Sequence, residues 1–305
     1  MSSQTHDPMI SPPDSLEVFE RMRPRLFGLA YRMTGSVEDA EDLVQEAYLR
    51  WHEADRATVR NPEAWLISVT TRLSIDRWRR LAVEREAYPG NWLPEPIATD
   101  PAAHPERAVE QHSDLSVAFL LLLERLGPEE RAAFVLREVF DTPYEDIARA
   151  LQKSEPATRQ LVHRARTRVR EGGRRYQPPA PTVKQRLFER FVAAVGADDE
   201  RELLSLFVPD AVLVGDGGGK VAASPRPIEG ADRVAHLFHT VWHKSGRHLT
   251  TRIGWLNGEP ALVTMENGAV VSAMTLTTDG TRIVGCYSVL NPDKLRGLSG
   301  TRQVR

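Results

Sequence analysis

Basic side chains between residues 149 and 175 have the composition of a phosphate-binding surface. The segment holds nine arginine or lysine residues against two glutamates, which gives it a local formal charge of plus seven. The whole chain has a formal net charge of −2, so the positive charge is concentrated here. A local basic face of this kind is the electrostatic footprint of nucleic-acid binding.

The spacing of residues predicts that a helix-turn-helix over residues 141–170 positions these basic groups. A first run of apolar residues at helical spacing ends at Leu151. Ser154 then stands as an N-cap, and Pro156 falls in the first turn of the second helix, where its missing N–H removes no intrahelical bond. At about 100° per residue, one face of this helix is apolar or small, with Thr158, Val162, Ala165 and Val169. The opposite face is polar, with Arg159, Gln160, His163, Arg164 and Thr167. We predict that the polar face reads DNA; the alternative is an arginine-rich helix that is merely solvated.

A second cluster of arginine and tryptophan lies between residues 61 and 80. Asn61-Pro62-Glu63 is a helix start, with an N-cap, a proline at the first helical position and an acid at the positive end of the dipole. The helix that follows carries Trp65, Arg72, Arg77, Trp78, Arg79 and Arg80. Arginine neutralises phosphate, and stacking of an unpaired base on an aromatic ring is worth about 1–3 kcal/mol, so the cluster suits single-stranded nucleic acid. Tryptophans at this spacing could equally belong to a core.

An acidic helix is predicted earlier in the chain. It begins with an S-x-x-D capping pattern at Ser36 and Asp39. A buried stripe steps by three and four residues through Val37, Ala40, Val44, Ala47 and Trp51. The outward face is acidic or polar, with Glu38, Glu41, Asp42, Gln45 and Glu46. Such a face by itself indicates no more than exposure to solvent.

Composition sets the class of protein. The 305 residues favour two or three domains, and 41% hydrophobic with 27% charged residues is ordinary for a globular protein. The first fourteen residues contain no apolar core of a signal peptide, and the longest apolar run, residues 117–123, is too short to span a bilayer. The single cysteine, Cys286, excludes an internal disulfide. We therefore expect a cytoplasmic protein without a membrane segment.

Two linkers divide the chain. Residues 87–111 contain five prolines and the segment Asn91-Trp92-Leu93-Pro94-Glu95-Pro96. A tryptophan beside a leucine is costly to leave in water, so we expect this segment to dock on a neighbouring domain. Two helices, 115–126 and 129–140, lead from it into the helix-turn-helix. A second proline-rich linker covers residues 176–181.

The helical half resembles a bacterial extracytoplasmic-function (ECF) sigma factor. The resemblance rests on LFGLAYRMTGSVEDAEDLVQEAYLRW and NPEAWLISVTTRLSIDRWRR for region 2, and on LGPEERAAFVLREVFDTPYEDIARALQKSEPATRQLVHRAR for region 4. It covers residues from about 15 to 172. It implies two all-α domains, a region 2 helical bundle and a region 4 helix-turn-helix, that bind the RNA polymerase core (its β and β′ subunits) and promoter DNA.

The resemblance also implies a role for individual residues. The groups that would grip the clamp helices of the β′ subunit are Asp39, Asp42, Leu43, Gln45 and Glu46. Those that would bind and melt the minus-ten element are Trp65, Arg72, Asp76, Arg77, Trp78 and Arg80. Those that would read the minus-thirty-five element in the major groove are Arg159, Gln160, His163 and Arg164. Many relatives have an asparagine where this chain has Arg72, which leaves the minus-ten base preference open.

The C-terminal part predicts an α+β domain. An amphipathic helix after residue 182 is followed by strand-like runs at 250–256, 261–265, 270–277 and 282–290. The turns between them are Asn257-Gly258, Asn267-Gly268 and Asp279-Gly280, whose residues supply the positive φ of tight hairpins. The layout predicts an antiparallel meander packed by helices, and it resembles the SnoaL-like, NTF2-like cone.

Three segments make the resemblance to sigma factors with a fused SnoaL-like domain more specific. They are the linker segment 92–96, the loop Asp216-Gly217-Gly218-Gly219-Lys220, and Asn291-Pro292-Asp293-Lys294-Leu295. We hypothesise that the three meet across a domain interface, with Trp92 as an anchor, and that the C-terminal domain so regulates the sigma domains in cis. A separate anti-sigma factor would then not be required.

The alternative is that the cone is a ligand sensor or an enzyme with a cavity active site. An enzyme needs an acid and a base in the cavity, and Asp216, His236 and Glu266 are the candidates. The glycine loop lacks the Gly-Lys-Ser/Thr spacing of a phosphate loop. Three histidines, His236, His239 and His243, share one side of a helix, and we expect them to be solvated rather than to bind metal. A simple DNA-binding repressor is a third, weaker interpretation.

The predicted organisation is therefore multidomain. It comprises a disordered N-terminus (1–14), region 2 (15–86), a linker (87–111), region 4 (112–175), a linker (176–181), the SnoaL-like domain (182–297) and a tail (298–305). We expect no cofactor and no metal.

Overall fold

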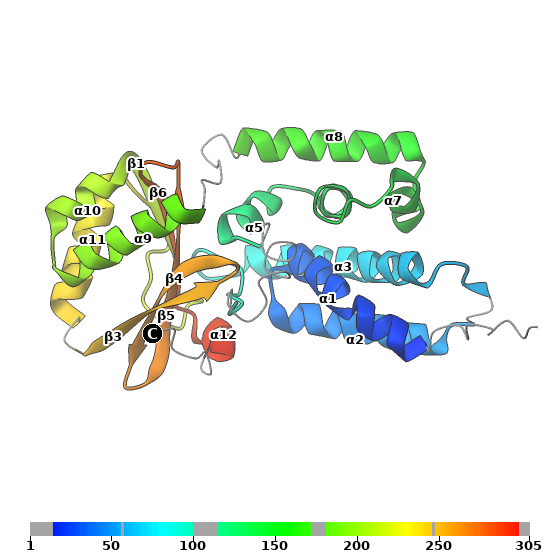
Figure 1. Cartoon of the computed structure of the whole chain (residues 1–305), viewed down its shortest axis with the longest axis horizontal. Coiled ribbons are helices and arrows are strands. Elements are labelled where there is room, and N and C mark those ends of the chain that lie inside the picture. Colours follow the sequence, from blue (N-terminus) through cyan, green and yellow to red (C-terminus); the bar gives the residue numbers. More distant parts are fainter. Residues whose placement is uncertain (1–14, 56–57, 100–114, 173–180, 246–247, 299–305) are drawn as a thin grey trace, which may run out of the picture.

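The computed structural model describes residues 15–55, 58–99, 115–172, 181–245 and 248–298. The predicted N-terminal segment 1–14, the linker beyond residue 99, the first residues of region 4, residues 173–180 of the second linker and the tail from residue 299 lie outside the described residues. Within the described part, a helical half occupies one end of the molecule and an α+β domain the other (Figure 1).

Three helices form the first unit: α1 (Ser15–Thr34), α2 (Val37–Glu53) and α3 (Pro62–Glu86). Both predicted starts are confirmed. The Ser36 side chain accepts a hydrogen bond from the N–H of Asp39 at 3.2 Å, and the Asn61 side chain accepts one from Ala64 at 3.1 Å. The predicted stripe of α2 is buried at Ala40, Val44, Ala47 and Trp51 and partly buried at Val37, and it packs with α1 and α3 in one core.

Four helices form the second unit: α5 (Val117–Leu123), α6 (Pro128–Phe134), α7 (Tyr144–Leu151) and α8 (Glu155–Gly172). The predicted helix 129–140 is continuous but changes to a π-helical turn at Val135–Val139. The helix-turn-helix is confirmed. Gln152 ends α7 with a φ of +54°, and Ser154 caps α8 through the N–H of Ala157 at 3.4 Å.

The two helical units share one hydrophobic core instead of two. Helix α3 lies against α6 and α7, and α1 contacts α6 (Figure 1). Arg131 on α6 is fully buried at this junction. Its Nε donates to the Arg32 carbonyl at 2.8 Å, and its Nη1 pairs with Glu124 at 2.7 Å. The helix predicted to melt promoter DNA is therefore covered by the helix-turn-helix unit.

The C-terminal domain is the α+β cone that the sequence predicts. Its helices are α9 (Pro181–Gly196), α10 (Glu200–Leu206), α11 (Ala231–Ser245) and α12 (Pro292–Leu295). Its strands are β1 (Phe207–Asp216), β2 (Ile228–Glu229), β3 (Leu249–Leu256), β4 (Glu259–Glu266), β5 (Ala269–Thr278) and β6 (Ile283–Val289), in the order β2-β1-β6-β5-β4-β3. Helices α9, α10 and α11 share a core with one face of the sheet. Residues that alternate with these along β4 and β5 form a second core on the other face.

Two details of the predicted meander were wrong. The sequence pattern missed β1, which runs parallel to β6, because its register shift between Phe207 and Val212 breaks the alternation of a regular strand. The third turn also differs: Asn257 and Asn267 have positive φ, whereas Asp279 does not. Instead, its carboxylate accepts the N–H groups of Thr281 and Arg282, each at 2.8 Å.

The buried Arg131 generates a stability prediction. Burial disfavours the charged form of Glu124, but the positive charges of Arg131 and Arg85 have the larger effect. The pKa of this carboxyl therefore lies below its ordinary value. Arg131→Met removes one partner of a buried charge, so we expect a loss of about 3–5 kcal/mol in the free energy of unfolding, measured by urea titration of the helical circular dichroism. The control is Arg166→Met, whose pair with Glu138 at 2.7 Å is largely exposed and is worth at most about 1 kcal/mol. Equal urea midpoints for the two variants would contradict this account.

Candidate functional site

All four predicted DNA-reading residues of α8 are exposed: Arg159, Gln160, His163 and Arg164. The opposite face is buried as predicted at Thr158, Val162 and Ala165, while Val169 is only partly buried. The arginines are held by acids of the same unit. Arg159 pairs with Glu155 at 2.5 Å and lies over the Tyr144 ring, 4.2 Å from its centroid, and Arg164 pairs with Glu130 at 3.2 Å. The Arg159–Glu155 pair is exposed, so phosphate or base edges can displace Glu155 at little cost. Arg164 differs, because its partner Glu130 has only 11% of its side chain exposed.

The predicted minus-ten residues of α3 are in two different environments. Arg72, Asp76 and Arg80 are exposed. The tryptophans are not free platforms. Trp65 packs against Trp51, with ring centroids 5.4 Å apart, at the edge of the helical core. The Nε1 atom of Trp78 is buried and has no hydrogen-bond partner among the described residues. Trp78 as a whole is partly exposed.

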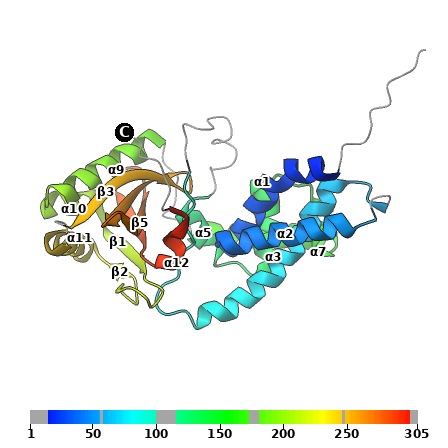
Figure 2. The same cartoon turned by 90° about the horizontal axis from the view of Figure 1, so that it is seen from below.

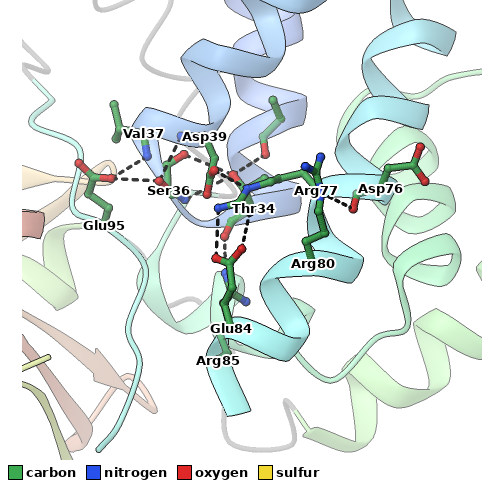
Figure 3. A network of polar contacts seen from close by, with 11 residues as sticks. Thr34, Ser36, Val37, Asp39, Asp76, Arg77, Arg80, Glu84, Arg85 and Glu95 are labelled. Carbon is green, nitrogen blue, oxygen red and sulfur yellow. Dashed lines mark hydrogen bonds and ion pairs between the residues drawn. The ribbon is translucent and has the colours of Figure 1, made fainter. Parts of the chain in front are cut away.

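Arg77 connects the predicted minus-ten residues to the predicted polymerase-binding helix (Figure 3). Its Nε lies 2.5 Å from Asp39 at the start of α2, and its Nη1 lies 2.7 Å from Glu84 on its own helix. Burial works against the charged guanidinium, but the bonds to Glu84 and Asp39 outweigh it and raise the pKa of Arg77. Two residues predicted to bind different partners therefore neutralise each other in the free protein.

The remaining polymerase-binding candidates lie along α2. Asp42 and Gln45 are exposed, and Glu46 pairs with Arg50 at 2.8 Å. Leu43 differs from the rest, because it is only 7% exposed and packs in the helical core. The candidates that remain exposed on α2 are thus polar, and they cover a narrower part of the helix than the sequence predicts.

A groove of about 990 Å³ runs between these helices and the C-terminal domain. One wall comes from α2, with Asp39, Asp42 and Glu46, and another from α3, with Arg77 and Arg80. The third wall is formed by Tyr88, Trp92 and Glu95 of the linker together with Asn291, Asp293 and Lys294. The structure thereby brings residues predicted for polymerase binding, for minus-ten binding and for interdomain contact to one groove.

Trp92 sits between the two halves of the molecule. The Arg85 guanidinium lies 3.5 Å from the centroid of its ring, and the Lys294 ammonium lies 4.4 Å away. The ring also packs on Gly35, where φ is +69° and a Cβ would lie 2.5 Å from the indole. A side chain at position 35 would therefore displace Trp92.

Leu93, and not Trp92, is the apolar anchor in the cone. It is 1% exposed and packs in the second core of the sheet. Its N–H donates to Asp216 at 2.9 Å, and its carbonyl accepts from Lys294 at 2.5 Å. Pro94 and Pro96 beside it are buried.

Glu95 binds the linker to the helical half of the molecule (Figure 3). Its carboxylate accepts the Val37 N–H at 2.8 Å and so caps the first turn of α2, while its own N–H donates to the Gly35 carbonyl at 2.8 Å. Burial raises the pKa of Glu95 even though these donors favour the carboxylate. The linker thereby fixes the start of the helix that carries the polymerase-binding candidates.

Asp216 is the point where the three marked segments meet. It is fully buried, and its carboxylate accepts from the Tyr88 hydroxyl at 2.7 Å, the Leu93 N–H at 2.9 Å and the Lys294 ammonium at 2.7 Å. Its carbonyl also accepts the N–H of Asn291 at 2.8 Å. This buried group is not available as a catalytic acid in the cone.

The glycines that follow Asp216 let the linker approach closely. At Gly218, with φ of +59°, a Cβ would lie 2.2 Å from the Asn291 side chain. At Gly219, with φ of +69°, it would lie 2.6 Å from Pro89. At the neighbouring Gly217, a Cβ would lie 2.2 Å from the Val221 carbonyl oxygen. Lys220 at the end of the loop pairs with Asp293. Asn291 caps α12, and in this helix Leu295 is buried while Pro292 is exposed.

Sequence reasoning missed three contact residues: Tyr31, Tyr88 and Asn257. Asn257 accepts the N–H of Ile97 at 3.0 Å and donates to the Tyr31 hydroxyl at 2.7 Å, so it joins the cone, the linker and α1. Burial raises the pKa of Tyr31 far above its ordinary range. The Asn257-Gly258 pair predicts only a turn. Nothing in the neighbouring sequence indicates that Asn257 also binds the linker and α1.

Comparison with known proteins identifies the family. The model described as sigma-70 region 2 matches residues 18–83, and the model described as sigma-70 region 4 matches residues 116–169. The chain is 36% identical over 291 residues to the ECF RNA polymerase sigma factor SigJ of Mycobacterium tuberculosis, covering 92% of each protein. The chain belongs to the ECF RNA polymerase sigma factors.

The similarity extends through the C-terminal domain of this sigma factor. It is 30% identical over 298 residues to the probable ECF RNA polymerase sigma factor SigI of Mycobacterium tuberculosis, covering 95% of this chain and 96% of that one. The crystal structure of SigJ matches it with a TM-score of 0.74 at 33% identity, over 92% of this chain and 98% of the other. Regions 2 and 4 are therefore followed by a fused SnoaL-like domain. No helix in the described part of the chain is both long and apolar enough to cross a membrane.

The catalytic candidates of the SnoaL-like domain do not meet. Of the three, Glu266 lines the cavity of the cone, whereas Asp216 is buried at the linker. His236 is exposed on α11 and lies 3.2 Å from Glu200. The other two histidines, His239 and His243, both lie beside Asp198 at 2.7 and 3.3 Å.

Lys294 gives a prediction for the sigma factor's pH response. Burial lowers its pKa from the ordinary 10.5 to about 8, although Asp216 favours the ammonium. Opening of the interface restores the higher pKa, so opening takes up a proton between about pH 8 and 10.5, and raising the pH through this window favours the docked form. The NMR shift of the Lys294 ε-methylene should titrate near pH 8 in the native protein and higher in Trp92→Ala. A native midpoint at the ordinary value would rule out the docked contact in solution.

The reading face of α8 gives a second prediction. If Arg159 or Arg164 binds guanine in two-point contact, replacement by alanine costs about 1–3 kcal/mol and relaxes specificity at one base pair. Binding of the holoenzyme to a panel of single-base variants of the minus-thirty-five element measures this. A uniform loss on every sequence would assign the arginine to phosphate instead.

Proposed function

We propose that this sigma factor directs promoter recognition by RNA polymerase and that its SnoaL-like domain regulates it in cis. In this proposal the acidic face of α2 binds the β′ subunit, α3 binds and opens the minus-ten element, and α8 reads the minus-thirty-five element. The observation that carries the regulatory part is the shared groove. Its walls combine the candidates for polymerase and minus-ten binding with the linker and residues 291–294.

The packing of the helical units supports a closed resting form. The two promoter elements are about 25 base pairs apart by their positions, or roughly 85 Å at 3.4 Å per base pair. Helices α3 and α7 are in direct contact, so regions 2 and 4 in this arrangement do not span that distance. Binding to a promoter thus requires that the two regions separate.

The linker contacts support control of polymerase and minus-ten binding by the SnoaL-like domain. The linker is bound at one end by Asp216 and Lys294 and at the other by α1 and α2, through Tyr31 and Val37. Separation of the halves breaks buried polar contacts, which resist opening more strongly than exposed ones. Because the restraint belongs to the chain itself, we propose that a separate anti-sigma factor is not required and that the protein acts in the cytoplasm, where its polymerase is.

Run-off transcription with core polymerase tests the proposal. Trp92→Ala and Lys294→Met weaken the restraint, so each should raise promoter-dependent transcript by about fivefold or more, the size of a typical coupling between sites. Lys244→Met, at an exposed position of α11, is the matched control and should leave transcription unchanged.

Two outcomes would count against the proposal in different ways. Transcription that stays at the native level in both variants, and in a chain shortened before residue 291, would refute regulation in cis. Failure of the native protein to start transcription from any promoter, with DNA binding retained, would favour a simple repressor.

A further inference from the structure

The cone of the SnoaL-like domain encloses a cavity that the proposed function does not use. It measures about 630 Å³ and lies between α11 and the face of the sheet that α11 covers. Cavities of about 300–1,000 Å³ are the usual size of small-molecule sites. The lining is mainly aliphatic and aromatic, with Leu213, Ile228, Leu237, Phe238, Trp242, Leu262 and Met274 among the residues that form it.

A short row of hydroxyl groups crosses the cavity wall. Thr251, Thr264 and Ser272 are direct neighbours on β3, β4 and β5, because Thr251 pairs with Thr264 and Thr264 pairs with Ser272. Their hydroxyls make no hydrogen bond to another residue in the part of the chain that the structure describes. They can therefore donate to or accept from a bound molecule at fixed positions in an otherwise apolar site.

The charge of the lining selects against anions. Glu266, exposed near the end of β4, is its one ionisable side chain among the described residues, and no lysine, arginine or histidine of those residues contributes to the wall. A carboxylate or phosphate would have to leave water without a cation to receive it, which is costly. A neutral molecule or a cation meets no such cost at Glu266.

One wall of the cavity is also part of the linker contact. Gly215, Ala223, Ser224 and Leu290 line the cavity. From the linker, the Asn91 side chain donates to the carbonyl of Gly215 at 3.2 Å and to that of Ser224 at 2.9 Å. A molecule that packs on this wall thus contacts the segment that holds the linker.

We propose that this cavity binds a neutral or cationic apolar small molecule and that binding favours the docked form of the sigma factor. The second part rests on the proposed regulation in cis. The cavity is already formed while the linker is docked, so a ligand gains its full contacts in that form and shifts the population toward it.

Binding is tested with a matched pair of fluorescent probes on the full chain. N-phenyl-1-naphthylamine is neutral and apolar, and 1-anilinonaphthalene-8-sulfonate adds one negative charge to the same rings. We expect saturable binding of the neutral probe and affinity for the sulfonate that is about tenfold weaker or worse. Equal affinity for the two probes would overturn the proposal.

Two variants locate the probe. Thr264→Trp fills the cavity and should weaken binding of the neutral probe by about tenfold or more, whereas Ile253→Phe on the same sheet, outside the lining and 43% exposed, should not. Glu266→Gln is at an exposed position and leaves the core intact, and it should strengthen sulfonate binding several-fold with little effect on the neutral probe. Unchanged sulfonate binding in Glu266→Gln would place the probe elsewhere and overturn the site.

Coupling to the linker is tested with Asn91→Ala, which removes the two hydrogen bonds to the cavity wall. We expect the Kd of the neutral probe to rise by about fivefold, as a coupling of ordinary size requires, and Gln185→Ala at an exposed position of α9 to leave it unchanged. An unchanged Kd in Asn91→Ala would overturn the coupling. Regulation in cis is tested separately, because the transcription of Trp92→Ala is measured without any probe.

Discussion

A buried carboxylate organises the contact between the two halves of this sigma factor. Asp216 is removed from water at the end of β1, where an unpaired charge would cost several kcal/mol. Its partners come from the adjacent glycine loop, through Gly218, and from two distant segments: Tyr88 and Leu93 of the linker, and Lys294 of the C-terminal helix. Because several segments share these hydrogen bonds, none of them can move away without leaving the Asp216 carboxylate exposed or without a partner. The contact is therefore cooperative.

Exposed and buried ion pairs have different consequences in this molecule. On α8, Arg159 is held by Glu155 at the surface, where an ion pair contributes little and is readily exchanged for phosphate. Inside the molecule, Glu124 joins the two helical units and Lys294 joins the linker to the cone; both are largely shielded from solvent, and each binds several donors or acceptors. The DNA-reading surface can thus change partner at little cost, whereas the junction changes only when several contacts break together.

The linker acts as a structural element rather than a spacer. Glu95 caps α2, Leu93 fills the second core of the cone, and Ile97 pairs with Asn257. The cone covers its own linker with one face of the sheet and encloses the cavity with the other. The same sheet therefore binds the linker on one face and lines the cavity on the other. A ligand in the cavity can affect the docked linker through the segment from Gly215 to Ser224.

The sequence by itself determined the parts of this protein that depend on local chemistry. N-caps at Ser36, Asn61 and Ser154, the two faces of α8 and the Asn-Gly hairpins follow from the preferences of a few adjacent residues, and the ECF sigma motifs identified the family. It also marked the three segments that meet. The tertiary structure alone decided that Leu93 enters the cone while Trp92 lies between Arg85 and Lys294, that Asn257 joins three elements, and that β1 runs parallel to β6. Each of these depends on at least one partner that lies 50 or more residues away. Such pairings are fixed by the packing of whole elements and not by any pattern along the chain.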